Sequence, residues 1–254
     1  MTSVEWASVL CAAFAAGLVN AIAGGGTLIT FPVMVAIGMP PLMANVTNSV
    51  ALCPGYFGGV LAQRRDLRDQ GRRLLRLVPA GILGGIGGGL LLLYSGDQIF
   101  ESVVPWLIAV ATGVLALQPA LRSWVTRRLA RRAQAGDLAW GFIPVALAAI
   151  YGGYFGAGLG MIMLATLGLV VEDTLARLNA AKQLLSLVIN GAAVIYFAFM
   201  AEVAWDVAAG MAVTALAGGF AGGHLASHLK ASHLRWLMVA AGSALAIHYF
   251  SRMP

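Results

Sequence analysis

The stretch Asn20-Ala21-Ile22-Ala23-Gly24-Gly25-Gly26-Thr27 interrupts the apolar sequence near the start of the chain. The residues on its two sides, from about 4 to 23 and from 28 to 37, are nearly all compatible with a membrane interior. In hydrocarbon an unwound backbone lacks hydrogen-bond partners, so a break persists only where protein buries it or where it lines a wet cavity. A helix that restarts after the glycines would direct free N–H groups and its positive dipole end at a ligand in that cavity. Close packing of two helices is the alternative explanation for the small residues.

The composition of the chain is typical of a membrane protein. Of its 254 residues, 60% are hydrophobic and only 10% are charged, whereas soluble domains carry roughly 25% charged residues. Several stretches of about 18 or more residues contain no charge, a length that crosses the hydrocarbon core as a helix. We therefore predict an all-α polytopic membrane protein whose surroundings are the lipid bilayer.

The distribution of charge predicts how the chain is oriented. Arginines are concentrated in residues 63–76 and 122–132, whereas residues 97–101 and 202–206 carry acidic side chains and no Lys or Arg. Cytoplasmic loops are enriched in Lys and Arg, so we place both arginine-rich loops in the cytoplasm. Topology alone accounts for the net charge of +6, and we expect no nucleic-acid partner.

The two halves of the sequence resemble each other when one is shifted by 134 residues. The same shift lays the arginine-rich residues 64–76 over the acidic outer segment 202–206. Halves that agree in pattern but oppose in loop charge indicate an inverted-topology repeat, which is typical of secondary transporters with a site between the repeats. We place the repeats at 1–120 and 139–254, joined by a basic cytoplasmic linker at 121–138. The matched pairs include Gly24 with Gly158, Gly26 with Gly160, and Asn45 with Asn179.

We expect each repeat to contain a broken, re-entrant helix hairpin followed by three transmembrane helices. Residues 4–38 would form the first hairpin, and residues 139–169 would form the second, entering from the cytoplasm. Residues 4–23 are also long enough to cross the membrane completely, which is the alternative. The glycine clusters at 81–89 and 218–223 form small-xxx-small pairs and predict closely packed helices; they would also suit a homodimer.

Polar residues inside the predicted spans are the candidates for binding, because they are costly in a membrane. Asn179, Lys182 and Gln183 recur at i, i+3 and i+4 and share one helix face. Lys182 lies about a turn and a half beyond Arg177, deep enough to balance the charge of an anion. The alternative is a lysine whose ammonium reaches back to the cytoplasmic surface.

Motifs for catalysis and metal binding are missing from the sequence. There is no G-x-S-x-G elbow, H-E-x-x-H motif, P-loop or Cys/His ligand cluster. We therefore predict that the protein is not an enzyme and holds no metal or cofactor. No Asp or Glu falls deep inside a predicted span, so the carboxylate usual in proton relays is absent as well.

Two motifs carry a resemblance to a known family. The first is the opening stretch followed by Phe31-Pro32 and by Ala44-Asn45-Val46-Thr47-Asn48-Ser49. The second is Gly152-Gly153-Tyr154-Phe155-Gly156-Ala157-Gly158-Leu159-Gly160 followed by Asn179-Ala180-Ala181-Lys182-Gln183. Together they resemble the sulfite exporter TauE/SafE family over nearly the whole chain. The resemblance implies a bacterial inner-membrane permease with an inverted-repeat fold that moves sulfite, sulfoacetate or other small sulfur-containing anions.

The sequence thus predicts a secondary transporter, in the export direction, for a small sulfur-containing anion held near mid-membrane between the two glycine breaks. An anion channel and a cation-coupled importer of another small metabolite are the alternatives. The residues that we predict to bind the substrate are Asn20, Gly24, Gly25, Gly26, Thr27, Asn45, Asn48, Gly156, Gly158, Gly160, Asn179, Lys182 and Gln183.

Overall fold

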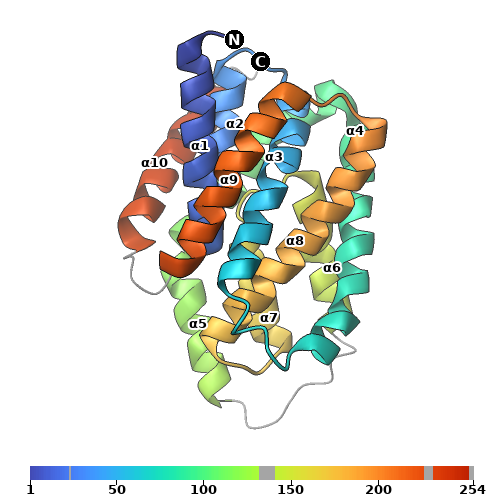
Figure 1. Ribbon diagram of the computed structural model, residues 1–254, viewed down its shortest axis with the longest axis vertical. Helices are drawn as coiled ribbons and strands as arrows, with labels where there is room; N and C mark the ends of the chain where they lie inside the picture. The colour runs from blue at the N-terminus through green and yellow to red at the C-terminus, as the bar shows by residue number, and fades with distance from the viewer. Residues whose placement is uncertain (23, 132–140, 226–230, 252–254) are drawn as a thin grey trace.

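The computed structural model describes residues 1–22, 24–131, 141–225 and 231–251 (Figure 1). Within these ranges the secondary structure is helical and contains no strand, which confirms the predicted all-α class. The helices are α1 (Ser3–Ile22), α2 (Thr27–Ala36), α3 (Pro41–Ala62), α4 (Gly71–Ala116), α5 (Gln118–Arg131), α6 (Phe142–Tyr154), α7 (Leu159–Val170), α8 (Leu175–Met200), α9 (Trp205–Leu225) and α10 (Ala231–Phe250).

Four helices of the described ranges, α1, α4, α8 and α9, are long and apolar enough to cross a membrane. Helix α4 breaks into two sections at Gly96, whose φ of 67° and ψ of 179° are open essentially to glycine alone. Large apolar side chains on the outer faces of these helices are exposed, among them Leu83, Ile195 and Val213. Exposed apolar surface of this extent fits contact with lipid, as expected of a multi-pass membrane protein.

The opening glycine stretch folds as the tip of a helix hairpin. Helix α2 runs back along α1, because Gly26 lies so close to the backbone of Ala16 that a Cβ would collide with it. Helices α6 and α7 form a second hairpin, and in Figure 1 the two hairpins enter the molecule from opposite ends. Their tips meet: a Cβ added to Gly24 would lie 2.7 Å from the Cα of Gly160. The two glycine breaks are thus the turns of helix hairpins, and how far each hairpin crosses the membrane stays a prediction.

The helix boundaries repeat with the spacing found in the sequence. Helix α3 begins at Pro41 and α8 at Leu175, and α4 begins at Gly71 where α9 begins at Trp205. The break in α4 at Gly96 corresponds to position 230, between α9 and α10. Each hairpin is thus followed by one helix and then by two helical sections. The opposite membrane orientation of the halves and their limits stay predictions; within the predicted linker, α5 is helical up to Arg131 and residues 132–138 lie outside the described part.

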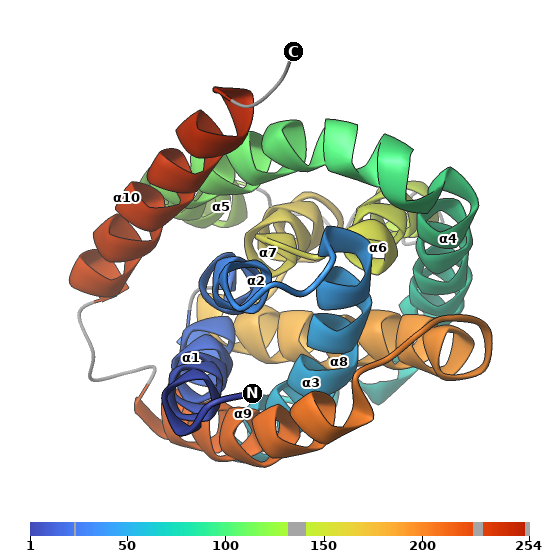
Figure 2. The same ribbon diagram turned by 90° about the horizontal axis from the view of Figure 1, so that it is seen from above.

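The glycine-rich helix of each half packs against the hairpin of the other half. Helix α9 lies along α1 and α3, and α4 lies along α6 and α8 (Figure 2). Gly218 contacts the backbone of Phe14 on α1, and Gly85 contacts the backbone of Ile189 on α8. A Cβ at either glycine would overlap a backbone carbonyl, so the predicted close helix packing is confirmed. This exchange of helices holds the two hairpin tips together at the centre of the molecule.

Candidate functional site

The place where the two hairpin tips touch is built from glycine backbone and one lysine. Gly24 and Gly160 are in backbone contact, and a Cβ on Gly160 would lie 3.6 Å from Cδ of Lys182. Lys182 is completely buried, and it is the one Asp, Glu, Lys or Arg among the buried residues of the described ranges. This burial excludes the alternative in which its ammonium reaches back to the cytoplasmic surface. Lys182 instead lies against the junction of the two halves.

Three neighbouring polar side chains of α8 are buried without a hydrogen-bond partner in the part of the chain that the structure describes. Among the described residues, Nζ of Lys182, both amide atoms of Gln183 and the hydroxyl of Ser186 form no hydrogen bond, and all three side chains are 0% exposed. Gly59 makes room for the amide of Gln183, because a Cβ there would overlap its Nε2. A buried charge without a partner is costly. None of the described residues supplies a hydrogen-bond partner for these groups.

The first glycine break is hydrogen-bonded by its own helix. Oδ1 of Asn20, near the end of α1, accepts from the N–H of Gly25 at 3.1 Å and of Gly26 at 2.7 Å. Gly24 and Gly25 adopt φ of 77° and 108°, values that L side chains rarely adopt. The N–H groups of Gly25 and Gly26 are therefore engaged with Asn20. Nδ2 of Asn20 has no partner within the described part of the chain.

The second break lacks such a cap. Tyr154 occupies the position that corresponds to Asn20, and its hydroxyl is bonded to Ser95 at 3.3 Å instead. Within the described ranges, the N–H groups of Ala157, Gly158 and Gly160 form no hydrogen bond. They precede or open α7, whose N-terminus carries a partial positive charge. Free N–H groups next to a buried ammonium favour a negatively charged group.

The remaining asparagines of the first half hold helices together. The amide of Asn48 accepts from Thr30 at 2.5 Å and donates to Thr27 at 3.3 Å, which ties α3 to α2. Nδ2 of Asn45 donates to the backbone carbonyl of Tyr154 at 2.9 Å. Its Oδ1 has no partner in the part of the chain that the structure describes. Most hydrogen bonds of Asn45 and Asn48 therefore join helices to one another.

The structure brings some predicted residues together and separates others. Nδ2 of Asn179 donates to Oε1 of Gln63 at 2.7 Å, so Asn179 joins α8 to the end of α3. Ser186 lies one turn beyond Lys182 and belongs to the same polar stripe of the sequence, at i+7 from Asn179, although the predicted set of substrate-binding residues does not include it. The contacts place Gly24, Gly160 and Lys182 at the junction, whereas Gln183 lies against Gly59 and Ser186 follows one turn beyond Lys182 on α8.

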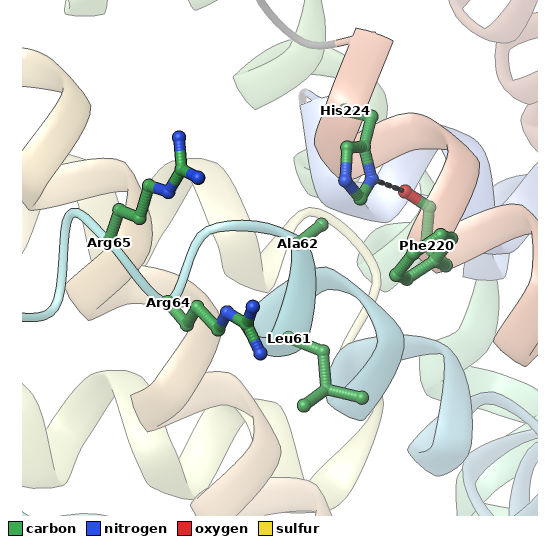
Figure 3. A pocket seen from close by; sticks show the side chains of 6 residues that line it. All are labelled: Leu61, Ala62, Arg64, Arg65, Phe220 and His224. Atoms are coloured by element: carbon green, nitrogen blue, oxygen red, sulfur yellow. Dashed lines mark hydrogen bonds between the residues drawn. The ribbon is translucent and has the colours of Figure 1, made fainter.

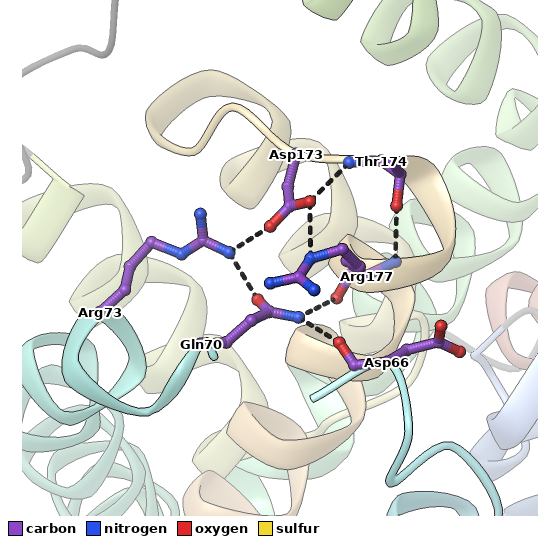
Figure 4. Close-up of polar contacts among 6 residues, drawn as sticks. All are labelled: Asp66, Gln70, Arg73, Asp173, Thr174 and Arg177. Atoms are coloured by element: carbon purple, nitrogen blue, oxygen red, sulfur yellow. Dashed lines mark hydrogen bonds and ion pairs between the residues drawn. The ribbon is translucent and has the colours of Figure 1, made fainter. Parts of the chain in front are cut away.

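A polar cluster joins the two halves at the ends of α4 and α8 (Figure 4). Asp173, in the loop before α8, pairs with Arg73 at 2.5 Å and with Arg177 at 2.8 Å. Gln70 accepts from Arg73 and donates to the backbone carbonyls of Asp66 and Arg177. Burial raises the pKa of the Asp173 carboxyl, but the hydrogen bonds from the two arginines lower it by more, so the net pKa lies below its ordinary value. The carboxyl therefore stays charged at neutral pH.

Aromatic rings join the halves on the α2 side of the junction. The rings of Phe31 on α2 and Phe155 after α6 meet edge to face, with centroids 5.6 Å apart. Phe100 on α4 contacts both Phe155 and Tyr154 at 6.3 Å and 5.9 Å. Such pairs add about 0.5–1.5 kcal/mol each beyond the burial of their area. The rings and the ion pairs of Asp173 are thus two separate sets of contacts between the halves.

Broken helices that meet around a buried lysine, here without a partner among the described residues, are a construction found in membrane transporters. The model of the Sulfite exporter TauE/SafE family matches residues 9–249, so the chain belongs to this family and is a membrane transporter. This confirms the resemblance found in the sequence.

Curated relatives carry matching descriptions. The chain is 29% identical to a "Probable membrane transporter protein" of Haemophilus influenzae over 79% of its length and 77% of that protein. It is 26% identical to "Probable membrane transporter protein ORF9" of Sinorhizobium sp, over 95% of the chain and 90% of the relative. "Probable membrane transporter protein YfcA" of Escherichia coli K12 is 27% identical over 87% of the chain and 78% of the relative.

Proposed function

We propose that the protein exports a small sulfur-containing anion, such as sulfite or sulfoacetate, across the bacterial inner membrane. The observation that carries the proposal is the buried Nζ of Lys182, which has no partner among the described residues and lies beside the contact of Gly24 with Gly160. An anion bound there would neutralise the ammonium, which otherwise lies uncompensated in the protein interior.

The chemistry of the donors supports a sulfur oxyanion. Sulfite and sulfonate groups present several acceptor oxygens around one sulfur atom. Lys182, the amide of Gln183, the hydroxyl of Ser186 and the free N–H groups of the second break can donate to such oxygens. We place the anion on the α7–α8 side of the junction, because Asn20 already occupies the N–H groups of the first break.

Export follows from the charge of the proposed substrate. The membrane potential of a bacterium is negative inside, and it favours outward movement of an anion by about 2.3 kcal/mol per charge per 100 mV. No Asp or Glu is among the buried residues of the described ranges, so the site offers no carboxylate for proton coupling. We therefore propose movement down the electrochemical gradient of the anion, with the arginine-rich loops facing the cytoplasm.

Binding to the purified protein tests the proposal directly. Sulfite, sulfoacetate, taurine and thiosulfate would each be titrated while the melting temperature is followed, in the wild type, in Lys182→Gln and in Arg72→Gln. Arg72 is exposed, so this control removes the same charge from the surface. We expect a sulfur anion to stabilise the wild type and the control, and to lose at least tenfold in affinity in Lys182→Gln.

Flux assays in vesicles distinguish the transporter from its alternatives. A transporter gives saturable uptake and counterflow of labelled anion, whereas a channel gives no counterflow. Equal anion binding by the wild type and Lys182→Gln would refute the assignment of the site. An importer of a neutral metabolite would keep its activity in Lys182→Ala.

A further inference from the structure

A hollow lies away from the glycine junction, between the last turns of α3 and α9 (Figure 3). Its volume is about 510 Å³, within the range of small-molecule sites. None of its lining residues belongs to the junction around Lys182, so its occupant does not depend on the proposed substrate. The lining residues are Leu61, Ala62, Arg64, Arg65, Phe220 and His224.

The hollow carries positive charge that the described chain does not neutralise. Arg64 and Arg65 follow the end of α3, and neither forms an ion pair within the ranges that the structure describes. The ring of His224 packs against that of Phe220 at a tilt of 54° with centroids 4.4 Å apart, and its Nδ1 lies 3.0 Å from the Phe220 carbonyl. Since a carbonyl only accepts, Nδ1 carries the hydrogen, and Nε2 is left for a further hydrogen bond.

The helix ends at the hollow do not favour an anion, so the affinity for negative charge depends on the two arginines. Helix α3 ends at Ala62 and α9 at Leu225, so both present the negative ends of their dipoles here. Helix termini therefore do not attract an anion to this place. Any affinity for negative charge must come from the side chains of Arg64 and Arg65.

Apolar side chains form the other part of the lining and point to a lipid. Leu61 is 41% exposed and Phe220 is 50% exposed, on helices whose outer surfaces are apolar. An inorganic anion would contact only the guanidinium groups, whereas a phospholipid also offers acyl chains that cover Leu61 and Phe220. Basic hollows between transmembrane helices on the cytoplasmic side suit anionic head groups.

We propose that this hollow is a binding site for one anionic phospholipid of the cytoplasmic leaflet. Its phosphate lies between Arg64 and Arg65, and an acyl chain runs along Leu61 and Phe220. Nε2 of His224 accepts a hydrogen bond from a head-group hydroxyl, which phosphatidylglycerol provides. The bound lipid thereby bridges α3 of the first half and α9 of the second half, at the end of the molecule where the arginine-rich loop lies.

Native mass spectrometry of the purified protein tests this site with defined probes. Phosphatidylglycerol, phosphatidylcholine and inorganic phosphate would be titrated into the wild type, into the double variant Arg64→Gln/Arg65→Gln, and into the control Arg72→Gln/Arg76→Gln. Arg72 and Arg76 are exposed on α4 and do not line the hollow. We expect phosphatidylglycerol to bind the wild type and the control alike, and about tenfold or more weaker to the first double variant.

Two further comparisons decide between lipid and free anion. Phe220→Ala should weaken phosphatidylglycerol binding severalfold and leave inorganic phosphate unchanged. Equal binding of phosphatidylglycerol and phosphatidylcholine to the wild type, or equal loss in both double variants, would overturn the site. Displacement of the lipid by millimolar inorganic phosphate would show a free-anion site instead. Unchanged melting temperatures without added lipid establish that the variants are folded.

Discussion

At the scale of single residues, the buried side-chain amides differ in whether they are hydrogen-bonded. Asn20 and Gln183 are both buried, yet Asn20 is bonded to two backbone N–H groups while Gln183 has no partner in the described ranges. A buried N–H that loses its acceptor costs about 1–3 kcal/mol. Asn20 is therefore a residue that positions the first hairpin tip, and Gln183 is available to a ligand.

Replacing Asn20 should separate stability from anion binding. Asn20→Ala leaves the N–H groups of Gly25 and Gly26 without an acceptor, and we expect it to lower the free energy of unfolding by about 1–3 kcal/mol. Asn20→Asp keeps the acceptor oxygen but adds a negative charge at the hairpin tip whose Gly24 contacts Gly160. We expect it to retain stability and to weaken anion binding by tenfold or more. Melting temperature and anion titration, measured on both variants, check the two outcomes; loss of both properties in Asn20→Asp would contradict this role.

At the scale of elements, the two halves are joined by two different kinds of contact. Asp173 connects the loop before α8 to the start of α4 through charge, whereas Phe31, Phe100 and Phe155 connect α2, α4 and the second hairpin through ring packing. The ion pairs are partly exposed, so solvent limits their contribution to about 1 kcal/mol or less. The charged contact is thus the one that separates more easily.

Removing the carboxylate of Asp173 should loosen that end alone. In Asp173→Asn we expect faster amide hydrogen exchange in residues 66–73 and 173–177 at pH 7, and unchanged exchange around Phe31. Asp97→Asn is the control, because Asp97 is exposed and forms no ion pair among the described residues. Uniform acceleration along the whole chain would instead indicate general destabilisation.

The pH dependence of this contact follows from the same carboxyl. Because the folded pKa of Asp173 is lowered, its stabilising contribution is complete above the ordinary value of about 4 and is lost as the pH falls below it. We therefore expect the ratio of the exchange rates of Asp173→Asn and wild type, compared at the same pH, to be constant from pH 6 to pH 8.

At the scale of the whole molecule, neither half buries its own glycine-rich helix. Gly85 contacts Ile189 and Gly219 contacts Gly55, so each contact crosses from one half to the other. Expressed as two separate chains, residues 1–131 and 132–254 should assemble when they are made together and be degraded when each is made alone. Co-purification of an untagged half with a tagged half measures this assembly.

Matched glycine variants sharpen that test. Gly85→Ala should reduce recovery of the partner half severalfold, because its Cβ would collide with the backbone of Ile189. Gly87→Ala, two residues away, meets nothing within 4 Å and should assemble normally. Equal recovery with both variants would contradict the packing.

Much of the fold could be predicted from the sequence because its signals are local. The glycine break after Asn20, the absence of charge in the spans and the match of Asn45 with Asn179 are each visible in short segments. What could not be predicted depends on side chains that meet across the fold. Asn48 is occupied by Thr27 and Thr30 on another helix, and no local pattern indicates this.

The candidate site could be predicted in part, where its signal lies within one helix. The depth of Lys182 along its helix predicted a buried cation, and its side chain is buried. The pairing of Asp173 with Arg73, 100 residues apart, depends on which helices of the two halves become neighbours. The binding roles of the predicted residues stay predictions that the titrations above address.

Because the glycine-rich helices pack against the opposite half, their partners are synthesised at different times. Gly85 packs against Gly153, yet at about 5–20 residues per second a ribosome makes Gly153 roughly 3–14 s after Gly85. During that interval the part of α4 around Gly85 lacks the helix that covers it in the folded protein. The growing chain is therefore most open to proteolysis, or to pairing with a neighbouring copy, during its own translation.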